Sequence, residues 1–396
     1  MKMTPSIFML FTIYAVVNAY FPVFFRGMGY SVTQVGFLLA TLEIAGLILP
    51  VMLAPFIDKT QSHGLFFLLF AIILVLLPIP LFLIHGFLIT AICIACYAVG
   101  FKGAVPVSDS MASSALNGRQ DLYGRVRVAG SIGFVIMNLI MQHFISPDIT
   151  QKHIVLWTSI PALVLFITIL FIPGLLHKSK PVEKKINILT LPKNNIQKKD
   201  VSTSNFRLAS FPRFKPSFWF GIGFIFLMMF GQVSFTRFLS IYVDESLHST
   251  AFGFLWALSA AAEVPFMFFS GKFIKKFGSM HLLLFCALGT TLRCLMYVII
   301  PGLLGAVFGQ LLNSITYGLM HPAAVAFAVS NAPDKKHLVV SQTLYSVVSV
   351  GIASVLGNIV GGIIIDAYGF TALFVSFSVL PLIGLCAYGL FGRKLK

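Results

Sequence analysis

Long apolar runs follow one another along nearly the whole chain of 396 residues. A helix needs about 20 predominantly apolar residues to cross the hydrocarbon of a bilayer, and most of these runs are long enough. They cover residues 6–25, 35–55, 65–84, 87–101, 128–145, 154–176, 216–236, 251–271, 281–300, 302–330, 338–365 and 369–391. The sequence therefore predicts an all-α membrane protein with twelve transmembrane helices.

The amount and placement of charge agree with this prediction. Only 10% of the residues are charged, whereas soluble domains carry roughly 25%. Most of the 28 Lys and Arg residues fall on one side of the membrane if both termini are cytoplasmic, as the positive-inside rule requires. The net charge of +16 is thus explained by membrane topology, and we expect no nucleic-acid partner.

The first apolar run, residues 6–25, has the length of a secretory signal peptide and follows Lys2. No small-residue cleavage site follows it, and further apolar runs come at once, so we expect a retained first helix. We expect an integral protein of the bacterial cytoplasmic (inner) membrane, with the lipid bilayer as its main partner and a monomeric state.

One polar segment divides the chain. Residues 177–215 are rich in lysine and contain several prolines, a composition typical of a flexible linker. Together with both termini, we expect this linker to be cytoplasmic. The predicted domains are an N-terminal six-helix bundle at 1–176 and a C-terminal six-helix bundle at 216–396.

The two predicted bundles contain similar segments. "SVTQVGFLLA" (31–40) resembles "HSTAFGFLWA" (248–257), and at the same spacing "PFIDK" (55–59) falls on "KFIKK" (272–276). Parallel six-helix repeats are the architecture of major facilitator transporters, which bind substrate near the midplane between the repeats. The sequence therefore predicts a major facilitator fold built from two pseudo-symmetric bundles.

A few charged residues lie inside the apolar runs. A charge at the centre of a bilayer costs at least about 2.5–3.5 kcal/mol, so each should be paired, hydrated or functional. The acids are Glu43, Asp109 and Glu263, and the cations are Lys102, Arg237, Arg293 and, at the start of the fifth span, Arg127.

Asp109 and Arg127 flank the short loop "NGRQDLYG". A loop of this length makes the fourth and fifth spans antiparallel neighbours, so both charges can reach one level of a central cavity. Arginine offers a planar set of donors and aspartate two acceptors, which suits them to bind a hydroxyl-rich or amide-bearing solute. An equally good interpretation is a salt bridge that closes the helix pair on the cytoplasmic side.

Glu263 and Arg293 form the matching pair in the second half. A buried carboxylate near an arginine can be poised to load and release a proton, which favours a coupling role for Glu263. The alternative is a permanent ion pair that only anchors two helices.

Five further residues are candidates on weaker grounds. Glu43 is predicted to be a gate or cavity acid, or the partner of an inward-facing cation. Asp58 and Lys59 are predicted to form a loop bridge that steadies one conformation. Gln310 and Asn313 offer neutral hydrogen bonds at helical spacing, which either line the site or join helices.

Several motifs resemble the oligosaccharide:proton symporters, the lactose permease group, and more closely their phenylpropionate permease-like relatives. They include "NAYFPVFF" (18–25), "YGRVRVAGSIGF" (123–134), "AEVPFMFF" (262–269) and "SQTLYSVVSVG" (341–351). The resemblance implies that Asp109 and Arg127 bind the solute and that Phe134 stacks on its ring. It also implies that Glu263 contributes to binding and coupling, with Arg293 assisting deprotonation.

The chain departs from lactose permease at its proton relay. Asn313 and Thr316 stand where that permease has a histidine and a proton-carrying glutamate, and Val350 replaces a lysine. Any coupling here must therefore depend on Glu263 or Asp109, with Glu43 as a further candidate.

These observations predict a secondary active transporter that imports a small polar solute, a sugar, oligosaccharide or nucleoside, by proton symport with alternating access. The alternatives are proton-coupled uptake of a phenylpropionate-like aromatic carboxylic acid, or a drug–proton efflux pump, against which the absence of an acid from the first span counts. No nucleophile-and-base arrangement, phosphate loop or metal-ligand spacing is visible in the sequence. We therefore expect no enzyme activity, no metal and no cofactor, with the proton gradient as the energy source.

Overall fold

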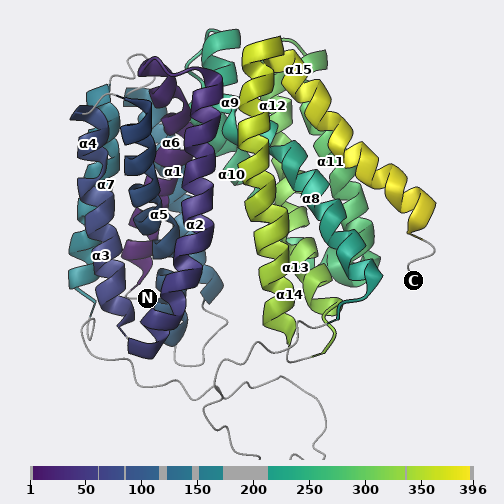
Figure 1. Cartoon of the computed structure of the whole chain (residues 1–396), viewed down its shortest axis with the longest axis horizontal. Coiled ribbons are helices and arrows are strands. Elements are labelled where there is room, and N and C mark those ends of the chain that lie inside the picture. The colour runs from purple at the N-terminus through teal and green to yellow at the C-terminus, as the bar shows by residue number, and fades with distance from the viewer. Residues whose placement is uncertain are drawn as a thin grey trace, which may run out of the picture.

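The computed structural model describes residues 3–60, 62–83, 86–115, 123–144, 151–172, 213–334 and 337–392. Within these ranges the chain is helical and contains no strand. In Figure 1 the helices α1 to α7 form one group and α8 to α15 form another beside it. The predicted linker lies outside the described residues except for 213–215, so the exact domain boundaries stay a prediction.

The first group contains α1 (Thr4–Gly27), α2 (Val32–Thr60), α3 (His63–Leu76), α4 (Pro78–Leu83), α5 (Phe87–Ala115), α6 (Tyr123–Phe144) and α7 (Gln151–Leu170). The second contains α8 (Pro216–Arg237), α9 (Leu239–Ile241), η2 (Tyr242–Ser246), α10 (Phe252–Phe277), α11 (Ser279–Ile299), α12 (Leu303–Leu311), η3 (Ser314–Leu319), α13 (Met320–Ser330), α14 (Leu338–Leu344), η5 (Tyr345–Ile352) and α15 (Ala353–Phe391). The segments η2, η3 and η5 are π-helical.

These helices accommodate the twelve predicted crossings. Within the described residues, 8 helical segments are long and apolar enough to span a bilayer, and the last of them, Val340–Phe391, has 52 residues. It bends at Gly369, whose φ of 80° lies in the left-handed region that glycine tolerates, so it supplies two crossings. The shorter apolar helices Val32–Ile48, Val128–Phe144 and Ile154–Leu170 complete the set. The predicted all-α membrane architecture is confirmed.

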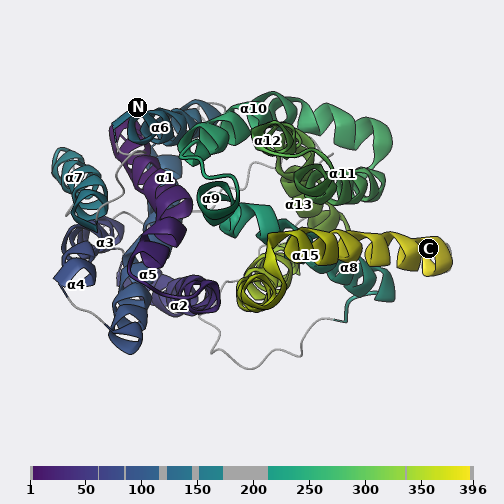
Figure 2. The same cartoon turned by 90° about the horizontal axis from the view of Figure 1, so that it is seen from above.

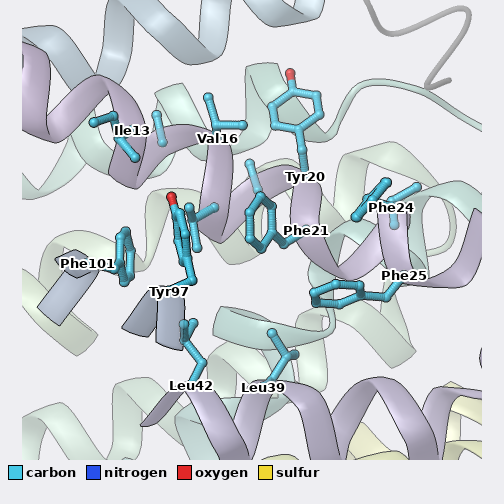
Figure 3. Close-up of a cluster of buried hydrophobic side chains, with 14 of the residues drawn as sticks. Ile13, Val16, Tyr20, Phe21, Phe24, Phe25, Leu39, Leu42, Tyr97 and Phe101 are labelled. Carbon is cyan, nitrogen blue, oxygen red and sulfur yellow. The ribbon is translucent and has the colours of Figure 1, made fainter. Parts of the chain in front are cut away.

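The core of the first group forms around α1, which packs against α2, α5, α6 and α7. Figure 3 shows aromatic side chains of α1 meeting those of α5 beside leucines of α2. The centroid of the Phe21 ring lies 5.6 Å from that of Phe25 and 5.8 Å from that of Tyr97. This apolar packing fixes α1 as the central helix of its group, with one further face left toward the second group.

The two groups touch through helices that are far apart in the sequence. In Figure 2, α2 lies beside α15 and α6 lies beside α10, in agreement with their packing. The Asp366 carboxylate accepts hydrogen bonds from the backbone N–H groups of Val32 (3.1 Å) and Thr33 (2.7 Å), at the first turn of α2. We call this region, where α1 ends and α2 begins, the contact end.

Two further ties join the groups at the contact end. The Arg26 side chain forms an ion pair with Glu245 on η2. The backbone N–H of Phe254 on α10 donates to the Gln142 side chain of α6 over 3.1 Å. Near the contact end the groups are therefore joined by polar bonds in addition to the packing of α2 on α15 and of α6 on α10.

Candidate functional site

A cavity of about 280 Å³ lies between the two groups of helices. Its wall is formed by α1 and α6 from the first group and by α8, α10, α11 and η3 from the second. The aromatic part of the wall consists of Phe11, Tyr14, Phe134, Phe235, Trp256 and Tyr317. A concave site with apolar walls and a few polar groups is the usual form of a small-molecule site.

Phe134 and Trp256 meet across the cavity from opposite groups of helices. Their ring centroids lie 6.3 Å apart in an edge-to-face arrangement, a preferred geometry for aromatic pairs. The Trp256 indole N–H donates to the Ser240 hydroxyl over 3.1 Å, which fixes the orientation of the ring. Phe134 thus lies where the sequence predicted a stacking surface, and its role in binding stays a prediction.

Arg293 is almost fully buried, with 1% of its surface exposed, and lies on the wall of the cavity. Its guanidinium donates to the side-chain oxygens of Asn313 (2.6 Å), Thr316 (2.7 Å) and Gln310 (3.0 Å). It also lies 3.9 Å from the centroid of the Phe235 ring, a cation–π contact. Neutral acceptors and a ring therefore hold this cation in place.

Asn313 links Arg293 to Glu263. Its amide nitrogen donates to the Glu263 carboxylate over 3.0 Å and to the backbone oxygen of Ser259 over 3.2 Å. Within the described residues Glu263 and Arg293 form no direct ion pair, so the predicted matching pair is joined through an amide instead. A carboxylate held by one amide and open to the cavity is freer to exchange a proton than one locked to a guanidinium.

Gln310 lies behind this network rather than on the described cavity wall. Besides accepting from Arg293, it donates to the Tyr297 hydroxyl over 2.8 Å. Of the two neutral residues predicted at this level, Asn313 lines the cavity and Gln310 joins helices.

The backbone next to Asn313 is irregular, and this irregularity positions the site. The π-helical segment η3 follows directly and supplies Thr316 and Tyr317. Gln232 on α8 donates to the backbone oxygen of Thr316 over 2.9 Å. Short π-helical segments are frequent at functional sites because they turn side chains away from the regular helical positions.

A second polar cluster contains Asn18, Glu43, Lys102 and Arg237, and we call it the inter-group cluster. Glu43 is 7% exposed, and its carboxylate accepts from Lys102 through both oxygens at 2.9 Å. It also accepts from Arg237 at 2.5 Å, and Arg237 donates to Asn18 over 3.0 Å. Of the roles expected for Glu43, the cluster gives it that of a partner for inward-facing cations.

The inter-group cluster was predicted only in part. Glu43, Lys102 and Arg237 were recognised as charges within apolar runs, but their association and the part of Asn18 were missed. A single amide in the first apolar run was the available signal for Asn18. Asn18 and Arg237 both line the cavity, so the cluster and the cavity share a wall.

Asp109 is half-buried on α5 and is not among the residues that line this cavity. Arg127 lies on α6, but its side chain is outside the described residues, as are those of Asp58 and Lys59. The fourth and fifth spans are in contact, as predicted, but within the described residues this contact is slight and α6 packs chiefly on α1 and α10. A short loop joins the ends of two helices without fixing how they pack along their lengths. The roles of Asp109, Arg127, Asp58 and Lys59 stay predictions.

Over the same described ranges, no group of three or more His, Cys, Asp or Glu side chains is placed to hold a metal ion.

A model of the "MFS_1 like family" matches residues 1–376. The chain belongs to the MFS_1-like family. Among curated relatives of this MFS_1-like chain, the uncharacterized transporter YwbF of Bacillus subtilis (strain 168) is 22% identical over 295 residues, 73% of this chain and 67% of the relative. A maltose permease of Geobacillus stearothermophilus is 28% identical over 145 residues, 37% of this chain and 36% of the relative.

Solved structures share the fold of this MFS_1-like chain. The nucleoside transporter NupG aligns with a TM-score of 0.79 at 13% identity over 99% of this chain and 98% of NupG. A POT family transporter in complex with 5-aminolevulinic acid aligns with a TM-score of 0.73 at 13% identity over 100% of this chain and 96% of that protein. The predicted major facilitator fold is confirmed, and the protein is an integral membrane transporter of this type rather than an enzyme.

Proposed function

We propose that this transporter imports a small, polar, ring-bearing solute by proton symport with alternating access. A sugar, oligosaccharide or nucleoside is the proposed solute class. Among the similar proteins, one is named a maltose permease and another a nucleoside transporter. The resemblance of the sequence motifs to the oligosaccharide:proton symporters supports the same class.

The observation that carries the proposal is the composition of the cavity wall. Phe134 and Trp256 offer ring faces, while Asn313 and Glu263 offer an amide and a carboxylate at the same cavity. Rings that stack on a sugar or base, combined with hydrogen-bonding groups that fix its orientation, suit a solute with both a ring and polar substituents.

Glu263 is the proposed site of proton coupling. It lies on the cavity wall, where a bound solute and a proton can affect the same carboxylate. Its only described side-chain partner is the neutral Asn313, through which it connects to Arg293. Loading a proton on Glu263 therefore changes the charge beside the solute without requiring a direct ion pair to break.

An aromatic carboxylic acid is the second candidate solute. Arg237 and Arg293 both lie on the cavity wall, where the described acid is Glu263 alone. A solute carboxylate would balance this excess of positive charge, and the aromatic wall would accept its ring.

The proposal includes a monomer in a bacterial inner membrane, with the termini and the linker cytoplasmic. Its support is the distribution of Lys and Arg along the chain, because such residues gather on cytoplasmic loops.

The test is uptake of radiolabelled solutes into proteoliposomes, with and without an inward proton gradient. The panel consists of maltose, uridine and 3-phenylpropionate. We expect accumulation of maltose or uridine that depends on the gradient. Accumulation of 3-phenylpropionate alone would select the second candidate, and uptake that ignores the gradient would refute proton symport.

Two substitutions test the solute-binding roles predicted from the sequence. Asp109→Asn and Arg127→Ala are each expected to abolish solute binding while the protein stays folded. Normal uptake by both variants would refute the solute-binding roles predicted for these two residues.

A further inference from the structure

Arg237 belongs both to the cavity wall and to the inter-group cluster. It lies on the wall of the cavity, and it is the member of the inter-group cluster that comes from the second group of helices. Its partners Glu43 on α2 and Asn18 on α1 come from the first group. The bonds of Arg237 therefore tie the two groups together at the cavity itself.

The Glu43 carboxylate has a second cation that stays with it. Lys102 on α5 belongs to the same group of helices as Glu43 and donates to both carboxylate oxygens at 2.9 Å. Gly46, on the next turn of α2, leaves the space that the Lys102 side chain fills. Among the described residues, Glu43 is the one acid that pairs with either Lys102 or Arg237.

This arrangement makes separation of the two groups asymmetric in charge. When the groups part, Glu43 keeps Lys102 and remains part of a neutral pair. Arg237 leaves with the second group and loses its carboxylate. A cation without a counter-charge in a partly desolvated site is costly, so the empty protein resists separation until something in the cavity replaces Glu43.

We propose that Arg237 contacts the transported solute and exchanges the Glu43 carboxylate for an acceptor oxygen of that solute. Lys102 makes the exchange possible by keeping Glu43 compensated after Arg237 has left. Arg237 thereby determines which solutes permit the groups to separate: those that place an acceptor oxygen at the Arg237 guanidinium. This inference rests on the proposed transport function. It adds a residue that contacts the solute and a requirement that a transported solute must meet.

The sign of two substitutions distinguishes this exchange from a simple tie. Arg237→Gln removes the stranded cation, so the empty protein should separate more readily. Lys102→Met removes a residue that does not bond across the groups, yet separation should become harder, because Glu43 and Arg237 would then both be left without a partner. If the cluster only ties helices together, Lys102→Met should not make separation of the two groups harder.

Separation is measured as the reaction rate of a buried thiol at the contact end. In a variant whose five native cysteines are replaced, Phe252→Cys supplies the thiol, since Phe252 is fully buried and packs 5.1 Å from the Tyr20 ring of the other group. The rate of reaction with N-ethylmaleimide then follows the population of separated molecules. Without solute, we expect Arg237→Gln to raise the rate and Lys102→Met to lower it by about tenfold.

The Arg26–Glu245 pair supplies the matched control. It also ties the groups together, but neither residue lines the cavity. Glu245→Gln should raise the labelling rate and keep its response to solute. Maltose, uridine or 3-phenylpropionate, whichever raises the rate in the parent, should not raise it in Arg237→Gln.

An unchanged or higher rate in Lys102→Met, or a full solute response in Arg237→Gln, would overturn the proposal. If no solute of the panel affects the parent, the proposed exchange fails for this solute class, even where the two substitutions act with the signs expected from the charge asymmetry.

Discussion

The amide of Asn313 connects the cation and the acid of the cavity, so its removal should weaken the fold as well as the site. Asn313→Ala removes an acceptor from Arg293 and a donor from Glu263, at 2.6 Å and 3.0 Å respectively. Hydrogen bonds to charged groups contribute about 1.5–3 kcal/mol each. Thr316 still accepts from the same guanidinium nitrogen, and water can enter from the cavity. We therefore expect a loss of about 2–4 kcal/mol in the free energy of unfolding.

The assay is reversible unfolding in mixed micelles with increasing sodium dodecyl sulfate, followed by tryptophan fluorescence. Ser314→Ala is the matched control, because Ser314 is the next residue and is about as buried. Within the described residues its hydroxyl donates to the local backbone oxygen of Leu311 alone, over 2.8 Å. A neutral bond of this kind contributes about 0.5–1.5 kcal/mol. If Asn313→Ala costs no more than Ser314→Ala, the bridge between Glu263 and Arg293 does not stabilise the protein.

Three further predictions concern solute binding, proton coupling and the contact end. Phe134→Ala and Trp256→Ala should each weaken solute binding about tenfold in equilibrium dialysis, from lost stacking and burial, while Phe144→Ala, at an exposed position, should have no effect. Glu263→Gln should keep solute counterflow in proteoliposomes but lose accumulation driven by a proton gradient; retained accumulation would assign coupling elsewhere. Asp366→Asn should weaken the tie to the first turn of α2, raising thiol labelling at Phe252→Cys several-fold, and an unchanged rate would show that this tie does not hold the contact end closed.

The architecture was predictable because it follows from quantities that a sequence displays directly. Apolar runs mark the helices, and the polar segment 177–215 predicts where the chain divides. Charges inside apolar runs are rare enough that Glu263 and Arg293 could be singled out, and both line the cavity.

The details of the site could not be predicted in the same way. A membrane helix is apolar on nearly every face, so its sequence does not show which face meets the cavity. For this reason the sequence offered both Asp109 and Arg293 as candidates, although of these two only Arg293 lies on the described wall. The bridge through Asn313 and the contact between Glu43 and Arg237 depend on packing between segments far apart in the chain.

The claim that the cavity between the two groups of helices holds the solute is tested most directly by protection of a single thiol. Ser131 lines the cavity, and Ser376 on α15 is exposed and is not among the residues that line it. In the variant lacking native cysteines, solute that is taken up should slow N-ethylmaleimide labelling of Ser131→Cys in proportion to occupancy and leave Ser376→Cys unchanged. Equal labelling of Ser131→Cys with and without saturating solute would place the solute site elsewhere.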